Sequence, residues 1–428
     1  MEKLITFASA AIASTAVFAV APVVSDVRMS QDASRTVTIN YTLSEGPGIV
    51  TVDIQTNAGD NAWVSIGGKH LTYFAGDVNK KVESGEHTMT WLPRRAWPDN
   101  EVKENVRAVV SAWALDVPPD YMVVSLTVPD TVFFYTSVES IPFGISNDMY
   151  KTDYLVMRKI PAANVTWRMG SPTTEGWHAA DEESRMITLG DDYYIGVYEV
   201  TQRQYEHVTG ADATSIACFR RESDYAMRPM ETVSWSTVRG GCEWPSAKHQ
   251  VGETCFIGKL RTLSGLEDMD LPTEAQWEFA CRAGCGDAFY NGKIGTNGYD
   301  EPNCGLVARY AYDGGLVHKE DGSLVWPDDY NCTSEQGTAK VGTYAPNAWG
   351  LYDMLGNVME FCLDWYVANP TQEESVAGGP TSGSDRSVRG GGFNHVAFEC
   401  RCAARKSISE TGTSDNCGFR LACSAVVK

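Results

Sequence analysis

The sequence predicts an α+β protein in which an N-terminal antiparallel β-sandwich precedes a larger, coil-rich domain. Three observations support this prediction. Polar and apolar residues alternate in the first part of the chain, which is typical of strands with one buried face. From about residue 160, Gly, Trp and Tyr become frequent and the regular segments become short. The chain has 428 residues, more than one ordinary domain contains, so at least two domains are expected.

The first 25 residues have the pattern of a secretory signal peptide. Lys3 is followed by a long run of small apolar residues that ends with AVA at 19–21. Pro22 disfavours cleavage directly after Ala21, so we expect the cleavage site somewhere in 19–25. A membrane anchor is the alternative, although Ala, Ser and Thr make the run only weakly hydrophobic. The sequence therefore predicts a secreted, periplasmic or cell-surface protein with no transmembrane segment beyond this peptide.

The predicted β-sandwich spans residues 26–130. In TVTINYTL, residues 36–43, every second residue is apolar, and the same alternation returns in 50–54 after a turn at Gly46 and Gly48. Further short runs follow at intervals of about ten residues, separated by Gly, Pro and Asn. Nothing in this segment indicates a site, so we interpret it as a binding or spacer module.

Helices are predicted at only a few places in residues 131–428. The clearest is DLPTEAQWEFACRAG, residues 270–284, where Thr273 and Gln276 form a capping box. A second helix is expected within 199–210, with Thr201 as its cap. A third begins near the segment 233–244. Long irregular segments are unusual in a compact domain unless disulfides or a metal ion hold them in place.

All twelve cysteines lie between Cys218 and Cys423. An even number of cysteines in an exported protein favours disulfides. Zinc is the competing interpretation, but the chain has no CxxC pair and its seven histidines are scattered. The confinement of the cysteines to one half of the chain also favours two separate domains.

A series of short motifs follows one another beyond residue 160. They are MGS (169–171), YYIGVYEVTQRQY (193–205), ETVSW (231–235), LPTEAQWEFACRAG (271–284), NAWGLYDMLGNVMEF (347–361), RSVRGG (386–391), CAAR (402–405) and CGFR (417–420). This ordered series resembles the formylglycine-generating enzyme family, also called the sulfatase-modifying factor family, over about residues 160–425. The resemblance implies a variant of the C-type-lectin fold, with much coil, few helices and small twisted sheets.

The resemblance also implies where an active site would lie. Enzymes of this family use molecular oxygen and two Cu(I)-binding cysteines to convert a sulfatase cysteine to formylglycine, and soft thiolates select Cu(I). The first reactive cysteine falls three residues after Gly392, where this chain has His395, and the second falls on Cys400. His395 and Cys400 are therefore the candidate catalytic residues, and Asn394 and His395 are candidate binding residues. The copper-binding pair is not intact.

The same resemblance implies two disulfides. The CAAR cysteine, Cys402, would pair with Cys281 in the helix after LPTEA, and Cys242 would pair with Cys423. Each bridge would close a loop of more than 100 residues. Loop-closure entropy gives about 4 to 5 kcal/mol for such a bridge in the ideal chain model. The pairing of the other eight cysteines, Cys400 and Cys417 among them, stays open.

A calcium site is predicted in DMLGNVME, residues 353–360. The resemblance implies that Ca²⁺ is held by the side chains of Asp353 and Glu360 and by the carbonyls of Gly356 and Val358. Oxygen ligands of this kind suit a hard cation. The role of the ion would be structural, and a solvated acidic turn is the alternative.

Several charged residues of the motifs are interpreted as structural. Arg389, Arg405 and Arg420 occur in contexts where a guanidinium usually bonds carbonyls and carboxylates. Glu274 and Glu278 lie on the predicted helix of 270–284 and are expected to orient backbone groups or arginines.

The net charge of −20 argues against binding to nucleic acid or to an anionic membrane surface. Two functions are the main candidates, and a purely structural cell-surface module is a third. The first is an exported, calcium-stabilised protein that binds an unknown ligand or polypeptide, with the loop 392–400 lining the binding surface. The alternative is a divergent formylglycine-generating oxidase, or a related metal-dependent oxidase, that uses His395 and Cys400. Copper would be required only in the second case.

Overall fold

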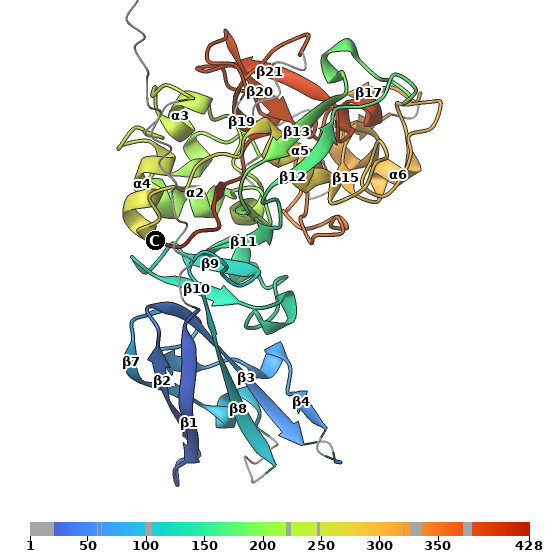
Figure 1. Cartoon of the computed structure of the whole chain (residues 1–428). Helices are drawn as coiled ribbons and strands as arrows, with labels where there is room; N and C mark the ends of the chain where they lie inside the picture. The colour runs from blue at the N-terminus through green and yellow to red at the C-terminus, as the bar shows by residue number, and fades with distance from the viewer. Residues whose placement is uncertain are drawn as a thin grey trace, which may run out of the picture.

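Figure 1 shows the computed structural model of the chain, in which two parts meet at a narrow waist. It describes residues 21–57, 59–60, 62–98, 105–219, 224–245, 249–319, 321–325, 336–370 and 379–428. The β-sandwich, coloured blue, is the lower part of Figure 1, and the larger coil-rich part lies above it. The α+β class is confirmed. Most of the predicted signal peptide, residues 1–25, falls outside the described residues.

Two sheets form the lower part. One has the strand order β1-β2-β7-β5, and in the other β3 pairs with β4, β6 and β8. The alternation in residues 36–43 is confirmed, because Val37, Ile39, Tyr41 and Leu43 are buried in the core of the sandwich. The bounds are β1 (Val23–Gln31), β2 (Val37–Ser44), β3 (Gly48–Asn57), β4 (Trp63–Ser65), β5 (Phe74–Gly76), β6 (Lys80–Val82), β7 (Gly85–Trp91) and β8 (Val106–Trp113), with the short helix α1 (Pro93–Ala96) after β7.

Small sheets and much coil form the upper part. One sheet has the order β10-β9-β11-β14-β23, another β21-β20-β19-β22, and β12 pairs with β13. Their bounds are β9 (Tyr121–Ser125), β10 (Val132–Tyr135), β11 (Tyr154–Ile160), β12 (Val165–Met169), β13 (Arg185–Leu189), β14 (Tyr193–Gly196), β19 (Met359–Trp365), β20 (Asp385–Arg389), β21 (Arg405–Ser409), β22 (Cys417–Gly418) and β23 (Ala422–Ser424). Two-residue strands complete the set: β15 (Ala308–Arg309), β16 (Val317–His318), β17 (Leu324–Val325) and β18 (Leu355–Gly356).

The strand pairing places the boundary between the two parts earlier than the predicted position at residue 130. β8 ends the sandwich at Trp113, whereas β9, which begins at Tyr121, pairs with β11 of the upper part. β1 begins at Val23, three residues before the predicted start at residue 26, because Val23 pairs with Ser44. Alternation identifies a strand but not the sheet it joins, which explains the difference at the later boundary. The expected start at residue 26 followed instead from the predicted end of the signal peptide.

The three predicted helices are confirmed, and so are the caps predicted for two of them. In α5 (Glu274–Arg282) and α2 (Gln202–Thr209), Thr273 and Thr201 each form a capping box with the glutamine three residues later. In α3 (Trp235–Arg239), Ser234 accepts a hydrogen bond from the Thr237 N–H. Two further helices are α4 (Phe256–Ser264) and α6 (Pro302–Gly305). Among the described residues, no helix combines the length and the apolar character needed to cross a bilayer.

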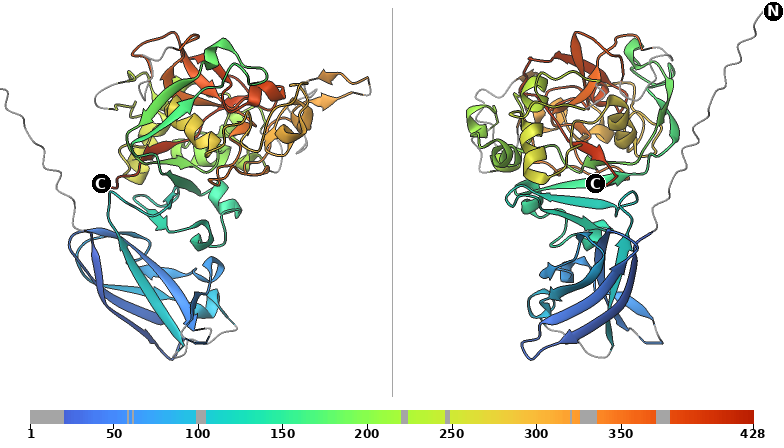
Figure 2. Two further views of the ribbon diagram at one scale, coloured as in Figure 1. Left: turned by 45° about the vertical axis from the view of Figure 1, so that its right-hand side comes forward. Right: turned by 60° about the vertical axis from the view of Figure 1, so that its left-hand side comes forward.

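The two parts are joined by close backbone packing. A Cβ atom on Gly68 of the sandwich would lie 1.2 Å from the carbonyl oxygen of Glu139, so only glycine fits there. The Phe134 N–H of β10 donates to the Asn79 carbonyl of the sandwich at 2.7 Å. Both views in Figure 2 place the C-terminus at this waist, where the Lys428 carbonyl accepts a hydrogen bond from Lys81.

Candidate functional site

The loop that carries His395 and Cys400 connects β20 to β21. Arg389 ends β20 and pairs in the sheet with Arg405, which begins β21. The Arg389 guanidinium is buried and donates to the three successive carbonyls of 402–404. The loop is therefore closed on itself around a fixed positive charge.

His395 is held as a neutral ring. Its Nδ1 accepts a hydrogen bond from the Gly392 N–H at 3.1 Å, and its Nε2 lies 3.5 Å from the Asn416 amide nitrogen. Burial lowers the pKa of His395 to about 4. Asn394 is tied to the same amide, since its Oδ1 accepts from Asn416 Nδ2 at 2.7 Å. The predicted binding residues Asn394 and His395 thus lie together.

Cys400 is buried with no exposed surface, and its thiol lies beside that of Cys304 of α6. Burial raises the pKa of the Cys304 thiol, which disfavours a thiolate there. His395 and Cys400 therefore have different partners in the structure: backbone and amide groups for the imidazole, and a second thiol for the cysteine. Sequence reasoning did not identify Cys304 as the neighbour of Cys400, because Cys304 lies in a segment that matches no motif.

The structure places the predicted disulfide cysteines in two different situations. Cys281 of α5 and Cys402 are both fully buried, and their thiols lie beside each other. Cys423 is in β23 and lines a groove of about 630 Å³, whereas Cys242 lies in the coil after α3. Both pairings stay predictions, and the contact between Cys281 and Cys402 is the one a bridge would need.

Glu360 is already neutralised by protein groups. Its Oε1 accepts from Arg420 Nη2 at 2.5 Å, and its Oε2 accepts from Arg420 Nε at 2.6 Å and from Trp277 Nε1 at 2.7 Å. This is a bidentate, fully buried ion pair. A calcium ion at Glu360 would have to replace Arg420.

Asp353 presents only one uncommitted oxygen. Its Oδ2 accepts from the Gly342 N–H at 2.6 Å, whereas its buried Oδ1 has no hydrogen-bond partner among the described residues. Burial raises the pKa of Asp353 to about 6. Gly356 has the left-handed φ of 74° that the sharp turn requires, and the Val358 N–H donates to Glu199. With Glu360 occupied, these four positions do not fit a calcium ion as they lie, and the calcium site stays a prediction.

The glutamates of α5 hold the arginines of the loop, as the sequence predicts. Glu278 accepts from Arg282 Nε at 2.8 Å and from Arg389, and Glu274 accepts from Arg405 at 2.6 and 2.8 Å. Burial acts to raise the pKa of Glu274, but Arg405 and Arg389 outweigh it and hold that pKa at about 2. These contacts give the arginines a structural role.

Three aromatic side chains form a cluster at the surface beside this loop. The Trp177 and Phe398 rings stack at 4.9 Å with an interplanar angle of 10°, and Tyr299 meets both edge-on at 5.7 and 5.6 Å. Trp177 is 38% exposed and Tyr299 is 45% exposed. Exposed apolar groups gathered in this way mark interaction sites more often than scattered ones do. We call Trp177, Tyr299 and Phe398 the aromatic cluster.

The backbone holds Trp177 in a conformation that large residues rarely adopt. Its φ is +67°, and its carbonyl accepts from Arg401 Nη2 at 2.7 Å. Arg401 is fixed in turn by Glu182 and Glu175. A Cβ atom on Gly298 would lie 2.2 Å from the indole, so the stack also requires a glycine there. Strain of this kind persists where the surroundings enforce it, often at functional sites.

Sequence reasoning missed the aromatic cluster. Trp177 and Tyr299 lie in coil with no periodicity, and no spacing connects them to each other. The only signal was the position of Phe398 within the loop 392–400. The contacts depend on tertiary packing, since Phe398 N–H donates to the Gly298 carbonyl at 2.7 Å.

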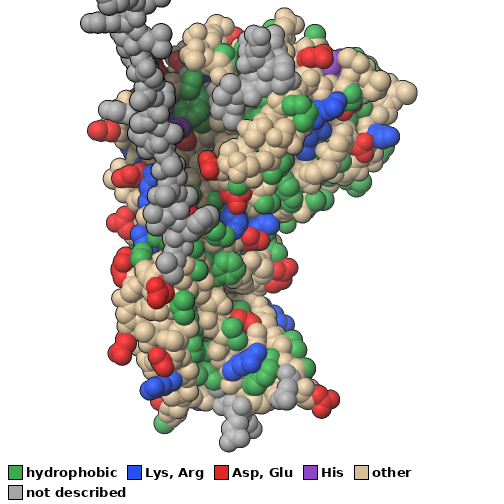
Figure 3. Space-filling view, in the orientation of Figure 1, with side chains coloured by type: hydrophobic (Ala, Val, Ile, Leu, Met, Phe, Trp, Pro, Cys, Tyr) green, Lys and Arg blue, Asp and Glu red, His purple; other side chains and the backbone are tan. Residues whose placement is uncertain are grey.

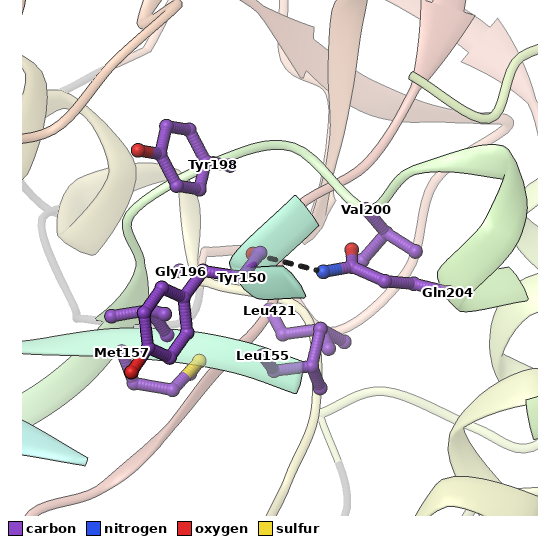
Figure 4. Close-up of a pocket in the computed structure, with 9 residues that line it drawn as sticks. Tyr150, Leu155, Met157, Gly196, Tyr198, Val200, Gln204 and Leu421 are labelled. Carbon is purple, nitrogen blue, oxygen red and sulfur yellow. Dashed lines mark hydrogen bonds between the residues drawn. The ribbon is translucent and has the colours of Figure 1, made fainter. Parts of the chain in front are cut away.

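A small cavity in the upper part is too small to hold a ligand. It has a volume of about 10 Å³ and is lined by Tyr150, Gln204 and Leu421, among others. Figure 4 shows the Gln204 amide pointing toward the Tyr150 backbone within it. Such a volume corresponds to roughly one water molecule.

Comparison with known proteins places the upper part in a family. The family model described as the sulfatase-modifying factor enzyme 1-like domain matches residues 157–425. The formylglycine-generating enzyme of Mus musculus is 30% identical over 200 residues, which are 45% of this chain and 44% of the relative. That of Thermomonospora curvata is 35% identical over 162 residues, covering 36% and 48%. The chain thus spans about half the length of the formylglycine-generating enzymes that it matches.

A relative that is not named as a formylglycine-generating enzyme matches this chain over a larger share of its own length than those two enzymes do. The chaperone protein LppX of Paenibacillus barcinonensis is 31% identical over 206 residues, covering 44% of this chain and 68% of the relative. Among solved structures, Treponema denticola variable protein 1 aligns with a TM-score of 0.46 and 23% identity, over 63% of this chain and 95% of that one.

Proposed function

The chain belongs to the sulfatase-modifying factor family, and from that premise we propose that it is an exported polypeptide-binding protein without the family's copper oxidase activity. One observation carries the proposal. The position of the copper-binding pair holds a partly buried, neutral imidazole, His395, and a thiol that contacts Cys304.

The chemistry of these two residues fits Cu(I) poorly. Two soft thiolates select Cu(I), and this chain supplies one thiol and one imidazole at the corresponding positions. The His395 Nδ1 already accepts a hydrogen bond, and the Cys400 thiol is buried against another thiol. The alternative function, a divergent formylglycine-generating oxidase or related metal-dependent oxidase, would require both residues to leave these partners.

The surface beside the lost pair supports polypeptide binding. The aromatic cluster is open rather than enclosed, which suits an extended chain better than a small molecule. Two kinds of relative have names or activities that involve polypeptides: the formylglycine-generating enzymes and the chaperone protein LppX. The β-sandwich would act as a spacer or a second binding module, and calcium has no role in this proposal.

We expect the purified protein to leave a sulfatase-type cysteine peptide unchanged when Cu(I) and oxygen are supplied. Conversion of the cysteine to formylglycine is measured by mass spectrometry, with the mouse formylglycine-generating enzyme as the positive control. The variant His395→Cys should also be inactive, because Cys400 keeps its contact with Cys304. Formylglycine produced by the wild type above the protein-free background would overturn the proposal.

If the aromatic cluster binds polypeptides, removing one of its side chains should weaken peptide binding. Peptides selected on the wild-type protein from a displayed random library should bind Trp177→Ala at least about tenfold more weakly, as expected for a central aromatic contact. Val64→Ala is the control, since Val64 of β4 is also an exposed apolar residue but lies in the sandwich, outside both the aromatic cluster and the cavities. Equal affinities for wild type and Trp177→Ala, or no enriched peptide at all, would contradict the proposed binding role.

A further inference from the structure

A second candidate site lies at the waist, separate from the aromatic cluster. It is a cavity of about 200 Å³ between the sandwich and the β10-β9-β11 sheet. Figure 3 shows hydrophobic side chains at the surface of this waist. Residues from both parts line the cavity: Leu71, Thr72, Tyr73, Phe74, Val78 and Asn79 come from the sandwich, whereas Val123, Phe133, Tyr135 and Phe143 are among those from the upper part.

Two exposed aromatic residues form part of the lining. Tyr73 is 42% exposed and Phe143 is 48% exposed, and their rings meet edge-to-face at 5.8 Å. They come from different parts of the molecule, so the pair bridges the junction. Exposed aromatic surface that continues into a cavity is typical of a ligand site.

Both residues have a backbone conformation that does not favour a large side chain. Tyr73 has φ +60° and Phe143 has φ +64°. Phe143 is the third residue of a turn closed by the Gly144 N–H and the Ile141 carbonyl at 3.1 Å, where a positive φ normally selects glycine. Phenylalanine at such a position leaves the backbone strained, and backbone strain of this kind is often found at functional sites.

The lining residues that the structure describes are uncharged. Apart from its apolar groups it offers the hydroxyls of Tyr135 and Tyr154, the Thr72 hydroxyl and the Asn79 amide. The Tyr150 hydroxyl is already committed to the Pro142 carbonyl at 2.8 Å, which fixes the segment that carries Phe143. In a protein of net charge −20, a cavity without a charged side chain excludes ions and admits neutral groups.

We propose that this junction cavity binds one uncharged aromatic ring that carries a hydrogen-bonding substituent, such as a phenol or an indole. The cavity volume of about 200 Å³ is large enough for such a ring, because an apolar cavity of about 150 Å³ accepts benzene. Aromatic walls favour offset or edge-to-face contacts with such a ring. The ring has two possible sources, a free small molecule or a tyrosine or tryptophan side chain of a partner, and both present the same chemistry.

The test titrates the full-length protein with p-cresol, with the anionic analogue 4-methylbenzoate and with N-acetyltyrosinamide, and follows binding by calorimetry. We expect saturable binding of p-cresol, at least tenfold weaker binding of 4-methylbenzoate, and displacement of p-cresol by N-acetyltyrosinamide if a peptide side chain is the natural occupant. Displacement would indicate a partner side chain, and its absence a free small molecule.

Variants connect the binding to the cavity. Met149→Trp, at a partly buried lining position, should fill the space and abolish p-cresol binding, and Phe143→Ala should weaken it at least tenfold. Val64→Ala, at an exposed apolar position of β4 outside the cavity, should bind p-cresol like the wild type. The proposal is overturned if p-cresol does not bind saturably, if 4-methylbenzoate binds equally well, or if Met149→Trp, shown to be folded by circular dichroism, retains wild-type affinity.

Discussion

Replacing Glu278 with alanine is expected to lower the free energy of unfolding by about 3 to 5 kcal/mol, the usual effect of leaving a buried charge without its partner. Glu278 has no exposed surface and receives hydrogen bonds from Arg282, from Arg389 and from the Gly170 N–H. Without it, the two guanidinium groups remain buried with one counter-charge fewer. The loss is measured by guanidinium denaturation followed by tryptophan fluorescence.

An exposed ion pair is the control for this prediction. Lys340 lies 3.1 Å from Asp148, and both side chains are accessible to water. Lys340→Ala should therefore change the free energy of unfolding by less than about 1 kcal/mol. A loss of that small size in Glu278→Ala would show that the carbonyl contacts of Arg389 and its ion pair with Glu274 hold the loop without Glu278.

The local signals of the sequence predicted the regular elements well. Thr273 and Thr201 were identifiable as caps because capping is a property of four consecutive residues, and the alternation in 36–43 directly reflects one buried face. The roles of Glu274 and Glu278 followed from the same helix. These features depend on neighbours in the chain, so a single sequence contains them.

The parts of the site that sequence reasoning missed depend on distant neighbours. Cys304 meets Cys400 across about a hundred residues, and Trp177 reaches Phe398 across more than two hundred. The calcium prediction considered the ligands of one short segment, whereas Arg420 approaches Glu360 from sixty residues away. A motif specifies which groups are present but not which partner each group meets in the folded chain.

Glu231, in the ETVSW motif, is a buried carboxyl whose environment was not apparent from the sequence. It has no exposed surface, its Oε1 accepts from the Cys218 N–H at 2.6 Å and the Phe219 N–H at 3.0 Å, and Thr232 donates to its other oxygen. Burial raises the pKa of Glu231 to about 7, although these hydrogen bonds act to lower it. The folded protein thus binds this proton more tightly than the unfolded chain does.

We expect Glu231→Gln to become more stable than the wild type as the pH rises. In the wild type, the tighter binding of the Glu231 proton stabilises the folded state. This stabilisation is complete below about pH 4.5, the ordinary pKa of a glutamate, and is lost as the pH rises through the folded pKa of about 7. The pKa difference corresponds to about 3 kcal/mol at pH 8, taken as an upper value. Glutamine keeps the acceptor oxygen for the two N–H groups and has no proton to lose.

The test compares the free energy of unfolding of the variant with that of the wild type at each pH, because other buried carboxyls also titrate. Asp364, for example, has its pKa raised by burial to about 7, and its contribution cancels in the difference. The free energy of unfolding should be similar for the two proteins at pH 4 and should diverge through pH 5 to 7. Glu86→Gln, at an exposed position on β7, should show no such divergence. If Glu231→Gln and wild type stay parallel from pH 4 to 8, then the Cys218 and Phe219 amides stabilise the carboxylate enough to offset its burial.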